Sequence, residues 1–170
     1  MNIKKRFIST FAILFLWTIS YAQSKTKCDK DISSIKNIAE AMLHAISGEK
    51  GQKRDWKRFE NLFLPTAQLN AVFHRGDSSW LKVSSLEEFI DKAGTWYEDN
   101  GFKEYSFKNK IDRFGNMAHV FQSYGAEFSG GKERGVNSIQ LVYDKGRWWI
   151  VNVLWDSETA ERKIPAEYLE

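Results

Sequence analysis

Cysteine and proline are scarce in this chain of 170 residues, which has one cysteine, Cys28, and two prolines. A single cysteine excludes an internal disulfide framework and leaves a thiol that is either free or paired with another chain. Two prolines and 11 glycines, beside 7 Trp and 12 Phe, exclude the collagen-like and low-complexity classes, in which aromatic residues are rare. The composition is therefore that of one globular domain with an aromatic core.

An excess of charge is also lacking once the first residues are set apart. The basic residues 4–6 account for the formal net charge of +3, so the remainder carries 22 basic and 22 acidic residues. We expect no nucleic-acid partner, because such binding needs a concentrated basic surface. The spacing of His44, His74 and His119 fits no metal site, and no glycine-rich phosphate loop precedes a helix. The sequence thus predicts no metal and no cofactor.

Residues 1–22 have the plan of a secretory signal peptide. Three basic residues precede an apolar run, residues 7–19, which is shorter than the roughly 20 residues that span a bilayer. Ser20, Tyr21 and Ala22 form a small-x-Ala ending that is typical of a cleavage site. We expect export to the periplasm or the medium after cleavage near Ala22, with no membrane attachment afterwards. A polar leader, residues 23–30, would then precede a single domain, residues 31–170.

Three amphipathic helices are predicted from the apolar spacing. The first follows Asp31 and carries a stripe that ends before Gly48, and the second places Trp56, Phe59 and Phe63 on one face and stops at Pro65. The third begins at a capping box around Ser85 and ends at Gly101. Between the second and the third, residues 68–74 are predicted as a strand. Four longer strands follow the third helix, with cores at residues 105–111, 118–128, 136–143 and 148–155.

The turn lengths predict which strand residues stand opposite one another. A two-residue turn at Gly115-Asn116 pairs Asn109 with Gln122 and Phe107 with Tyr124. A turn at Gly130-Gly131 pairs Tyr124 with Asn137. A three-residue loop, Asp144-Lys145-Gly146, then pairs Asn137 with Val153 and Leu141 with Trp149. These registers give one mainly apolar face, which the helices would cover.

The opposite sheet face is predicted to be charged at one edge and apolar on the last two strands. We expect the side chains of Glu104, Ser106 and Lys108 to be exposed to solvent. An apolar patch beside a charged edge indicates a subunit interface, so we expect a homodimer. The residues of this patch are Val136, Val142, Trp148, Ile150 and Leu154.

The order helix, helix, strand, helix and four-strand meander resembles the nuclear transport factor two-like superfamily, from Asp31 to about Leu169. The segments that carry the resemblance most clearly are residues 134–141, residues 146–151, Trp155 and Ile164-Pro165. They look like the last strands of small exported members of unassigned activity. The resemblance implies an α+β fold in which three N-terminal helices pack on a strongly curved, mostly antiparallel sheet. This cone-shaped, cystatin-like roll would enclose a cavity whose wall is the apolar sheet face.

The expected cavity wall carries few polar groups, and most of them are neutral. Asn109, Gln122, Tyr124 and Asn137 would form one patch across three strands, which either contacts a ligand or satisfies its own hydrogen bonds. Trp149 and Trp155 are expected to line the cavity, although inward aromatic residues more often form plain core. The expected ligand is a small molecule that is apolar or of mixed polarity.

Two other functions remain open at this point. Ketosteroid isomerase, a member of the superfamily, carries a carboxylate base on the strand that follows helix two, where this chain offers only His74. An isomerase, dehydratase or cyclase type of enzyme would therefore use His74 as general base and Tyr124 as hydrogen-bond donor. A non-catalytic interaction module, with its cavity filled by its own side chains, is the other alternative. The absence of carboxylates from the predicted cavity wall favours a binding protein.

Overall fold

A computed structural model describes residues 28–169 of the chain. The predicted signal peptide, its cleavage site and most of the polar leader lie outside these residues. A helical turn at residues 28–31, which includes the half-buried thiol of Cys28, precedes the first long helix. None of the helices in this part of the chain is both long and apolar enough to cross a bilayer.

Two helices precede the sheet, and a third follows its first hairpin. They are α2 (Ile35–Ile46), α3 (Trp56–Glu60) and α4 (Leu86–Asn100). The strands are β1 (Phe63–Arg75), β2 (Ser78–Ser85), β3 (Phe102–Phe114), β4 (Met117–Phe128), β5 (Gly131–Asp144) and β6 (Arg147–Ser157), and a short 3₁₀ turn, η1 (Ala166–Tyr168), ends the described chain.

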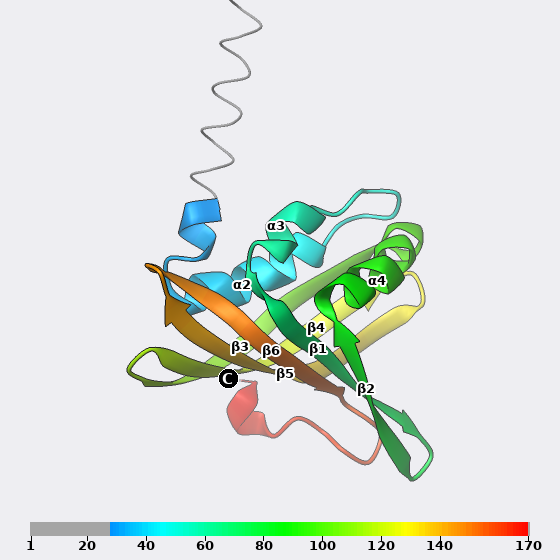
Figure 1. Cartoon of the computed structure of the whole chain (residues 1–170). Helices are drawn as coiled ribbons and strands as arrows, with labels where there is room; N and C mark the ends of the chain where they lie inside the picture. Colours follow the sequence, from blue (N-terminus) through cyan, green and yellow to red (C-terminus); the bar gives the residue numbers. More distant parts are fainter. Residues whose placement is uncertain (1–27, 170) are drawn as a thin grey trace, which may run out of the picture.

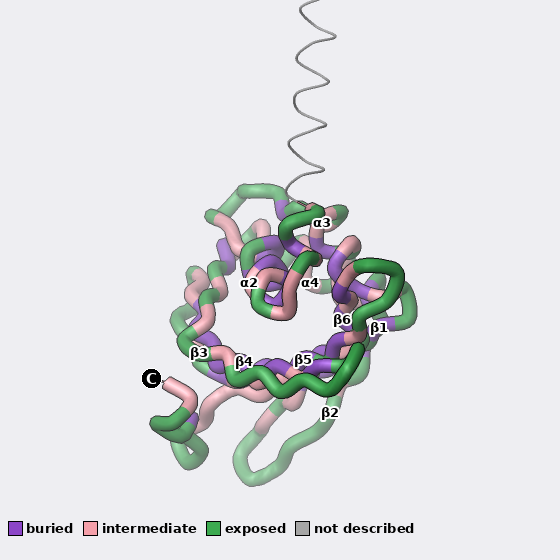
Figure 2. Tube along the Cα trace, turned by 90° about the vertical axis from the view of Figure 1, so that its left-hand side faces the viewer, coloured by how far each residue is buried: buried purple, intermediate pink, exposed green. Residues whose placement is uncertain are grey.

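The six strands form one open, mixed sheet. Their order is β2-β1-β6-β5-β4-β3; β1 and β6 run parallel and the other neighbours antiparallel. Figure 2 shows the sheet curving around α2 and α4, with the buried segments concentrated on α2 and the central strands. All three helices lie on one side of the sheet, and η1 lies on the other (Figure 1). We call these sides the inner and the outer face.

The helix ends follow from local sequence. Ser34 caps α2 and Ser85 caps α4, each with its hydroxyl accepting a hydrogen bond from a backbone N–H three residues later. The α2 stripe of Ile38, Met42 and Leu43 is buried against the sheet, as its spacing predicts.

The prediction that Pro65 ends the second helix is wrong. The helix α3 already ends at Glu60, with Asn61 as its C-cap, and Pro65 lies inside β1. The pairing of β1 with β6 is irregular between Phe63 and Gln68, which is where a strand tolerates a residue without an N–H. The sequence does not predict the strand β2. This edge strand exposes most of its residues, so it lacks the apolar alternation that indicates the other strands.

Two bulges set which side chains point inward. Phe107 is an extra residue in β3, because Ser106 pairs with Tyr124 and Lys108 pairs with Ser123. In the pairing of β5 with β6, the register shifts between Gln140 and Leu141. A side chain changes face when the register moves by one residue, so each bulge reverses the predicted orientation on one side of it.

The β5–β6 turn is tighter than predicted. Asp144 pairs with Arg147, so the turn has two residues, Lys145 and Gly146, with φ of +51° and +82°. Both are left-handed, as the favoured two-residue hairpin turn requires. Together with the bulge, this turn places Trp148 and Ile150 in the core, 4% and 0% exposed. The prediction that these two residues form an outer subunit interface is therefore wrong, whereas Val136, Val142 and Leu154 do lie on the outer face.

Candidate functional site

A pocket of about 580 Å³ opens on the inner face between the helices and the sheet. Its wall combines side chains from α2, α3, α4 and all six strands. Most of them are apolar or aromatic, and they include Met42, Leu69, Phe89, Trp96, Tyr97, Phe102, Phe128, Val153 and Trp155. The polar or charged side chains of the wall are Lys82, Lys92, Glu104, Glu133 and Asn137, together with the hydroxyls of Tyr97 and Tyr124.

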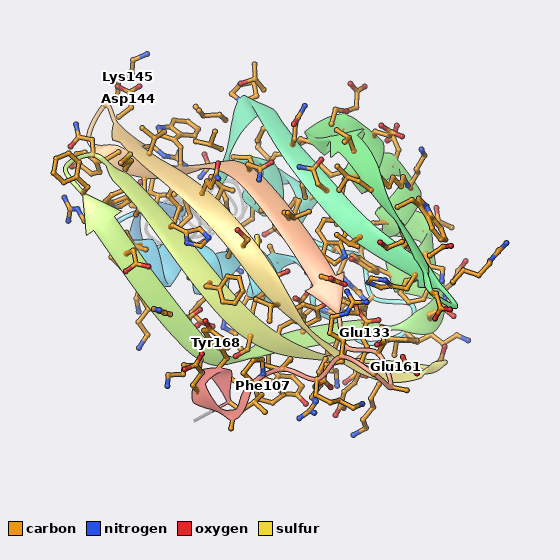
Figure 3. All side chains as sticks on the ribbon, turned by 90° about the horizontal axis from the view of Figure 1, so that it is seen from below. Phe107, Glu133, Asp144, Lys145, Glu161 and Tyr168 are labelled. Carbon is orange, nitrogen blue, oxygen red and sulfur yellow. The ribbon has the colours of Figure 1, made fainter. Side chains whose placement is uncertain are left out.

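Glu104 lies on the inner face, and the prediction that its side chain is exposed on the opposite face is wrong. It belongs to the part of β3 before the Phe107 bulge, where Phe102, Glu104 and Ser106 point inward, while Tyr105 and Phe107 point outward. Their outward rings cover Gly125 of β4, where an added Cβ would come within 2.7 Å of Tyr105 and 2.9 Å of Phe107. Figure 3 shows Phe107 and Tyr168 on this outer face, viewed from below. The glycine inside a strand is the sequence signal for this arrangement, because it marks a close approach.

Burial dominates the protonation of Glu104. Removal of the carboxyl group from water raises its pKa to about 7, although the hydrogen bond from Asn137 lowers it, and the negative charge of Glu133 raises it further. Burial also raises the pKa of Glu133 above its ordinary value of 4.5. The pocket therefore holds a carboxyl group that changes charge near neutral pH.

The three amides of the predicted polar patch form a hydrogen-bonded chain. Asn137 Nδ2 donates to Glu104 Oε1 at 3.0 Å and to Gln122 Oε1 at 3.3 Å. Gln122 Nε2 donates to Asn109 Oδ1 at 2.8 Å, and Asn109 Nδ2 donates to Glu40 Oε1 of α2 at 2.7 Å. Only Asn137 of the three amides borders the pocket. Asn109 and Gln122 act as supports that hold Asn137 and link β3, β4 and β5 to α2.

The predicted pairing of Tyr124 with Asn137 is wrong by two residues. The β4–β5 turn is Ser129-Gly130, so Asn137 stands opposite Gln122 and Tyr124 opposite Gly135. A shift of two residues keeps each side chain on its face, so Tyr124 and Asn137 both remain inward. The Tyr124 hydroxyl lies 3.1 Å from Ser157 Oγ, and its ring borders the pocket.

The two tryptophans expected in the cavity lie on opposite faces. Trp155 borders the pocket and meets Phe89 of α4 edge to face at 6.1 Å. Trp149 stands opposite Val142, on the outer face, where the guanidinium of Arg147 lies 3.6 Å from its ring centre. The predicted cavity position of Trp149 is therefore wrong, because the two-residue turn reverses this end of β6.

His74 lies on the outer face and does not border the pocket. Its Nε2 lies 2.6 Å from Asp156 Oδ1, and its Nδ1 lies 3.2 Å from the guanidinium of Arg162, which also contacts Asp156 at 3.3 Å. The ring is thus held in an ion-pair cluster between β1, β6 and the C-terminal segment. A general base at His74 would need its ring in the pocket, where Leu69 and Phe73 of the same strand point instead.

No group of side chains that could hold a metal ion occurs in residues 28–169.

Comparison with protein-family models gives no match, and comparison with curated protein sequences gives none either. Solved structures do match. An NTF-2 like protein of unknown function from Silicibacter pomeroyi has a TM-score of 0.50 and 17% identity, over 73% of this chain and 92% of that one. A cystatin-like-fold protein from Nostoc punctiforme has a TM-score of 0.58 and 11% identity, over 74% and 90% of the two chains. The LinA-type3 hexachlorocyclohexane dehydrochlorinase from Novosphingobium barchaimii has a TM-score of 0.56 and 12% identity, over 77% and 92%.

Proposed function

We propose that this chain is an exported protein that binds a small, largely apolar molecule in the inner pocket. It has the nuclear transport factor two-like fold, which confirms the resemblance seen in its sequence. Export rests on the pattern of residues 1–22. The observation that carries the binding role is the pocket itself. A volume of about 580 Å³ lies in the range of small-molecule sites, and its aromatic wall with a few polar groups is typical of them.

The polar groups define how a ligand would be oriented. Asn137 is 4% exposed, and its amide is fixed by Glu104 and Gln122. The Glu104 carboxyl keeps a second oxygen that makes no hydrogen bond within the described chain. We therefore place the polar end of the ligand at Glu104 and Asn137, and its apolar body against Phe89 and Trp155.

A fluorescent probe tests the pocket directly. N-phenyl-1-naphthylamine is uncharged at neutral pH and gains fluorescence in apolar sites, so we expect saturable binding of one probe per chain. Val153 borders the pocket and is 3% exposed, so Val153→Phe should fill part of the pocket and weaken binding on the order of tenfold, about 1.4 kcal/mol. Val72, which stands opposite Leu81 on the outer face of β1 and does not border the pocket, provides the control: Val72→Phe should bind the probe as the parent does. Equal binding by both variants would refute a site in this pocket.

An enzymatic role is a second candidate, which the raised pKa of Glu104 favours. A general base works best when its pKa lies near the working pH, and Glu104 meets this condition inside the pocket. In such an enzyme Glu104, and not His74, would take the proton. Deuterium from solvent should then enter a carbon position of the bound molecule, and the exchange should stop in Glu104→Gln. A ligand that stays unlabelled would leave binding as the function.

A further inference from the structure

Two carboxyl groups share one end of the pocket without a cation. Glu104 on β3 and Glu133 on β5 both border it, and the hydrogen-bond partner of Glu104 is the neutral amide of Asn137. The ion pairs of the described chain all involve other acids. Buried carboxylates are normally paired with a cation, so this end of the pocket is electrostatically incomplete.

Aromatic rings surround the same end. Tyr97 of α4 stacks on Phe102 at 4.3 Å, and Phe102 stacks on Phe128 at 6.5 Å; all three border the pocket. The face of an aromatic ring is negative and attracts an organic cation. Rings and carboxylates together form the chemical environment that recognises an ammonium group.

The opposite end of the pocket is basic. A smaller pocket of about 180 Å³ adjoins the first and shares with it Lys82, Lys92 and the rings of Phe73, Phe89, Trp96 and Trp155, but neither glutamate borders it. Lys92 is paired with Glu88 of its own helix, and Lys82 is half-buried on the inner face of β2. Charge therefore changes sign along the pocket, with Glu104 and Glu133 at one end, which we call the acidic end.

We propose that the acidic end binds the ammonium group of an organic amine, whose apolar body lies along Phe89 and Trp155. This inference rests on the proposed small-molecule function and gives its ligand a chemical class. The ammonium would donate a hydrogen bond to the open oxygen of Glu104 and lie against the rings of Tyr97 and Phe102. It supplies the positive charge that the protein itself does not place there.

The protonation of Glu104 makes the preference depend on pH. The charged or titratable groups that face it are Glu133 on β5, Tyr97 on α4 and Tyr124 on β4; Glu40 on α2 reaches it through the amide chain, and Lys82 and Lys92 lie at the far end. Burial raises the pKa of both tyrosines, so they stay neutral below pH 9. Amine binding should therefore strengthen as the pH rises through about 7, where Glu104 becomes charged.

Three probes with one ring system separate the charge of the ligand from its shape. Tryptamine carries an ammonium at neutral pH, tryptophol a hydroxyl and indole-3-acetate a carboxylate. Measured by calorimetry at pH 8 on the purified protein, tryptamine should bind at least about tenfold more tightly than tryptophol, the ratio expected for a charge-assisted bond. At pH 5.5 the ratio should shrink severalfold, because Glu104 is then mostly protonated.

Two variants locate the effect. Glu104→Gln keeps an oxygen that can accept from Asn137, and it should bring the ratio of the tryptamine and tryptophol affinities close to one. The control is Glu127→Gln, which removes an exposed carboxylate paired with Lys132, outside this pocket, and should keep the ratio of the parent. Equal binding of tryptamine and tryptophol, or tighter binding of indole-3-acetate, would overturn the amine proposal and leave the small-molecule function standing. If neither these probes nor N-phenyl-1-naphthylamine bind, both proposals fail.

Discussion

Glu104 is a carboxyl group in a mainly apolar pocket, and its surroundings make its charge costly. The sequence places it between Lys103 and Tyr105, where alternation alone would turn it to solvent. The extra residue Phe107 turns it inward, and within residues 28–169 Asn137 is the side chain that donates a hydrogen bond to its carboxyl group. A neutral side chain in its place is expected to fold at least as well.

The effect of Glu104 on stability should change with pH. The pKa of Glu104 is about 7 in the folded protein, and its ordinary value, which applies to the unfolded chain, is 4.5. The folded protein therefore binds this proton more tightly than the unfolded chain does. The stability that this proton contributes is complete below pH 4.5 and is lost as the pH rises through 7. Urea unfolding should therefore show Glu104→Gln close to the parent at pH 4.5 and more stable by about 3 kcal/mol at pH 8.5, since each tenfold change in proton affinity corresponds to about 1.4 kcal/mol. A difference between the two proteins that does not depend on pH would show that Glu104 is solvated.

Tyr124 shows why a glycine is needed opposite it. A Cβ on Gly135 would lie 2.5 Å from the Tyr124 hydroxyl oxygen and 2.5 Å from the backbone oxygen of Asp156. The Tyr124 ring can cross β5 only above a residue without a side chain. This contact, like the cover of Gly125 by Tyr105 and Phe107, ties a glycine inside a strand to an aromatic ring on its neighbour.

At the scale of elements, the sequence predicts what depends on local periodicity and misses what depends on one extra residue. The stripe of α2, the Ser85 cap of α4 and the pairing of Asn109 with Gln122 follow from spacing and turn length. The bulge at Phe107 and the left-handed Lys145 have no such signal in the neighbouring sequence; Gly125, which marks the bulge, lies on another strand. This error affects the candidate site, because reversing this end of β3 would place Tyr105 on the pocket wall in place of Glu104.

The reversed end of β6 can be tested with two neighbouring tryptophans. Trp148 is 4% exposed, and its ring meets Tyr143 at 5.3 Å, whereas Trp149 is half-buried on the outer face. Trp148→Ala should lower the free energy of unfolding by about 3–5 kcal/mol, as the loss of a buried large aromatic side chain does.

Trp149→Ala serves as the matched variant and should cost less than about 1.5 kcal/mol, because water replaces much of the lost contact. Chemical denaturation of the two variants compares them directly. A larger loss for Trp149→Ala than for Trp148→Ala would mean that β6 has the register of a three-residue turn.

At the scale of the whole molecule, the two faces of the sheet have separate roles. The inner face curves around α2 and α4 and carries the pocket (Figure 2). The outer face is crossed in part by residues 158–169, which we call the C-terminal strap. The strap is held by Arg134, which forms two hydrogen bonds with Glu158, by Lys108 Nζ on the Glu167 carbonyl oxygen, and by the ring of Tyr168 against Phe121.

We propose that the uncovered part of the outer face, at Val136, Val142 and Leu154, joins a second copy of the chain. Leu154 is 36% exposed, and Leu81 and Val83 of β2 extend the apolar surface at 56% and 51% exposed. Leu154→Glu should convert the dimer to a monomer in sedimentation velocity. Met117→Glu introduces the same charge at a residue that is 60% exposed at the β3–β4 turn, and should stay dimeric. A Leu154→Glu variant that sediments like the parent would exclude this interface.

The central claim is that the inner pocket holds a small molecule, and native mass spectrometry tests it most directly. The chain of residues 1–170 would be produced in its own host, purified gently, and weighed under native and denaturing conditions. The account predicts a native mass per chain that exceeds the denatured mass by one small molecule, which Val153→Phe loses and Val72→Phe keeps. Equal native and denatured masses, together with no saturable binding of N-phenyl-1-naphthylamine, would contradict it.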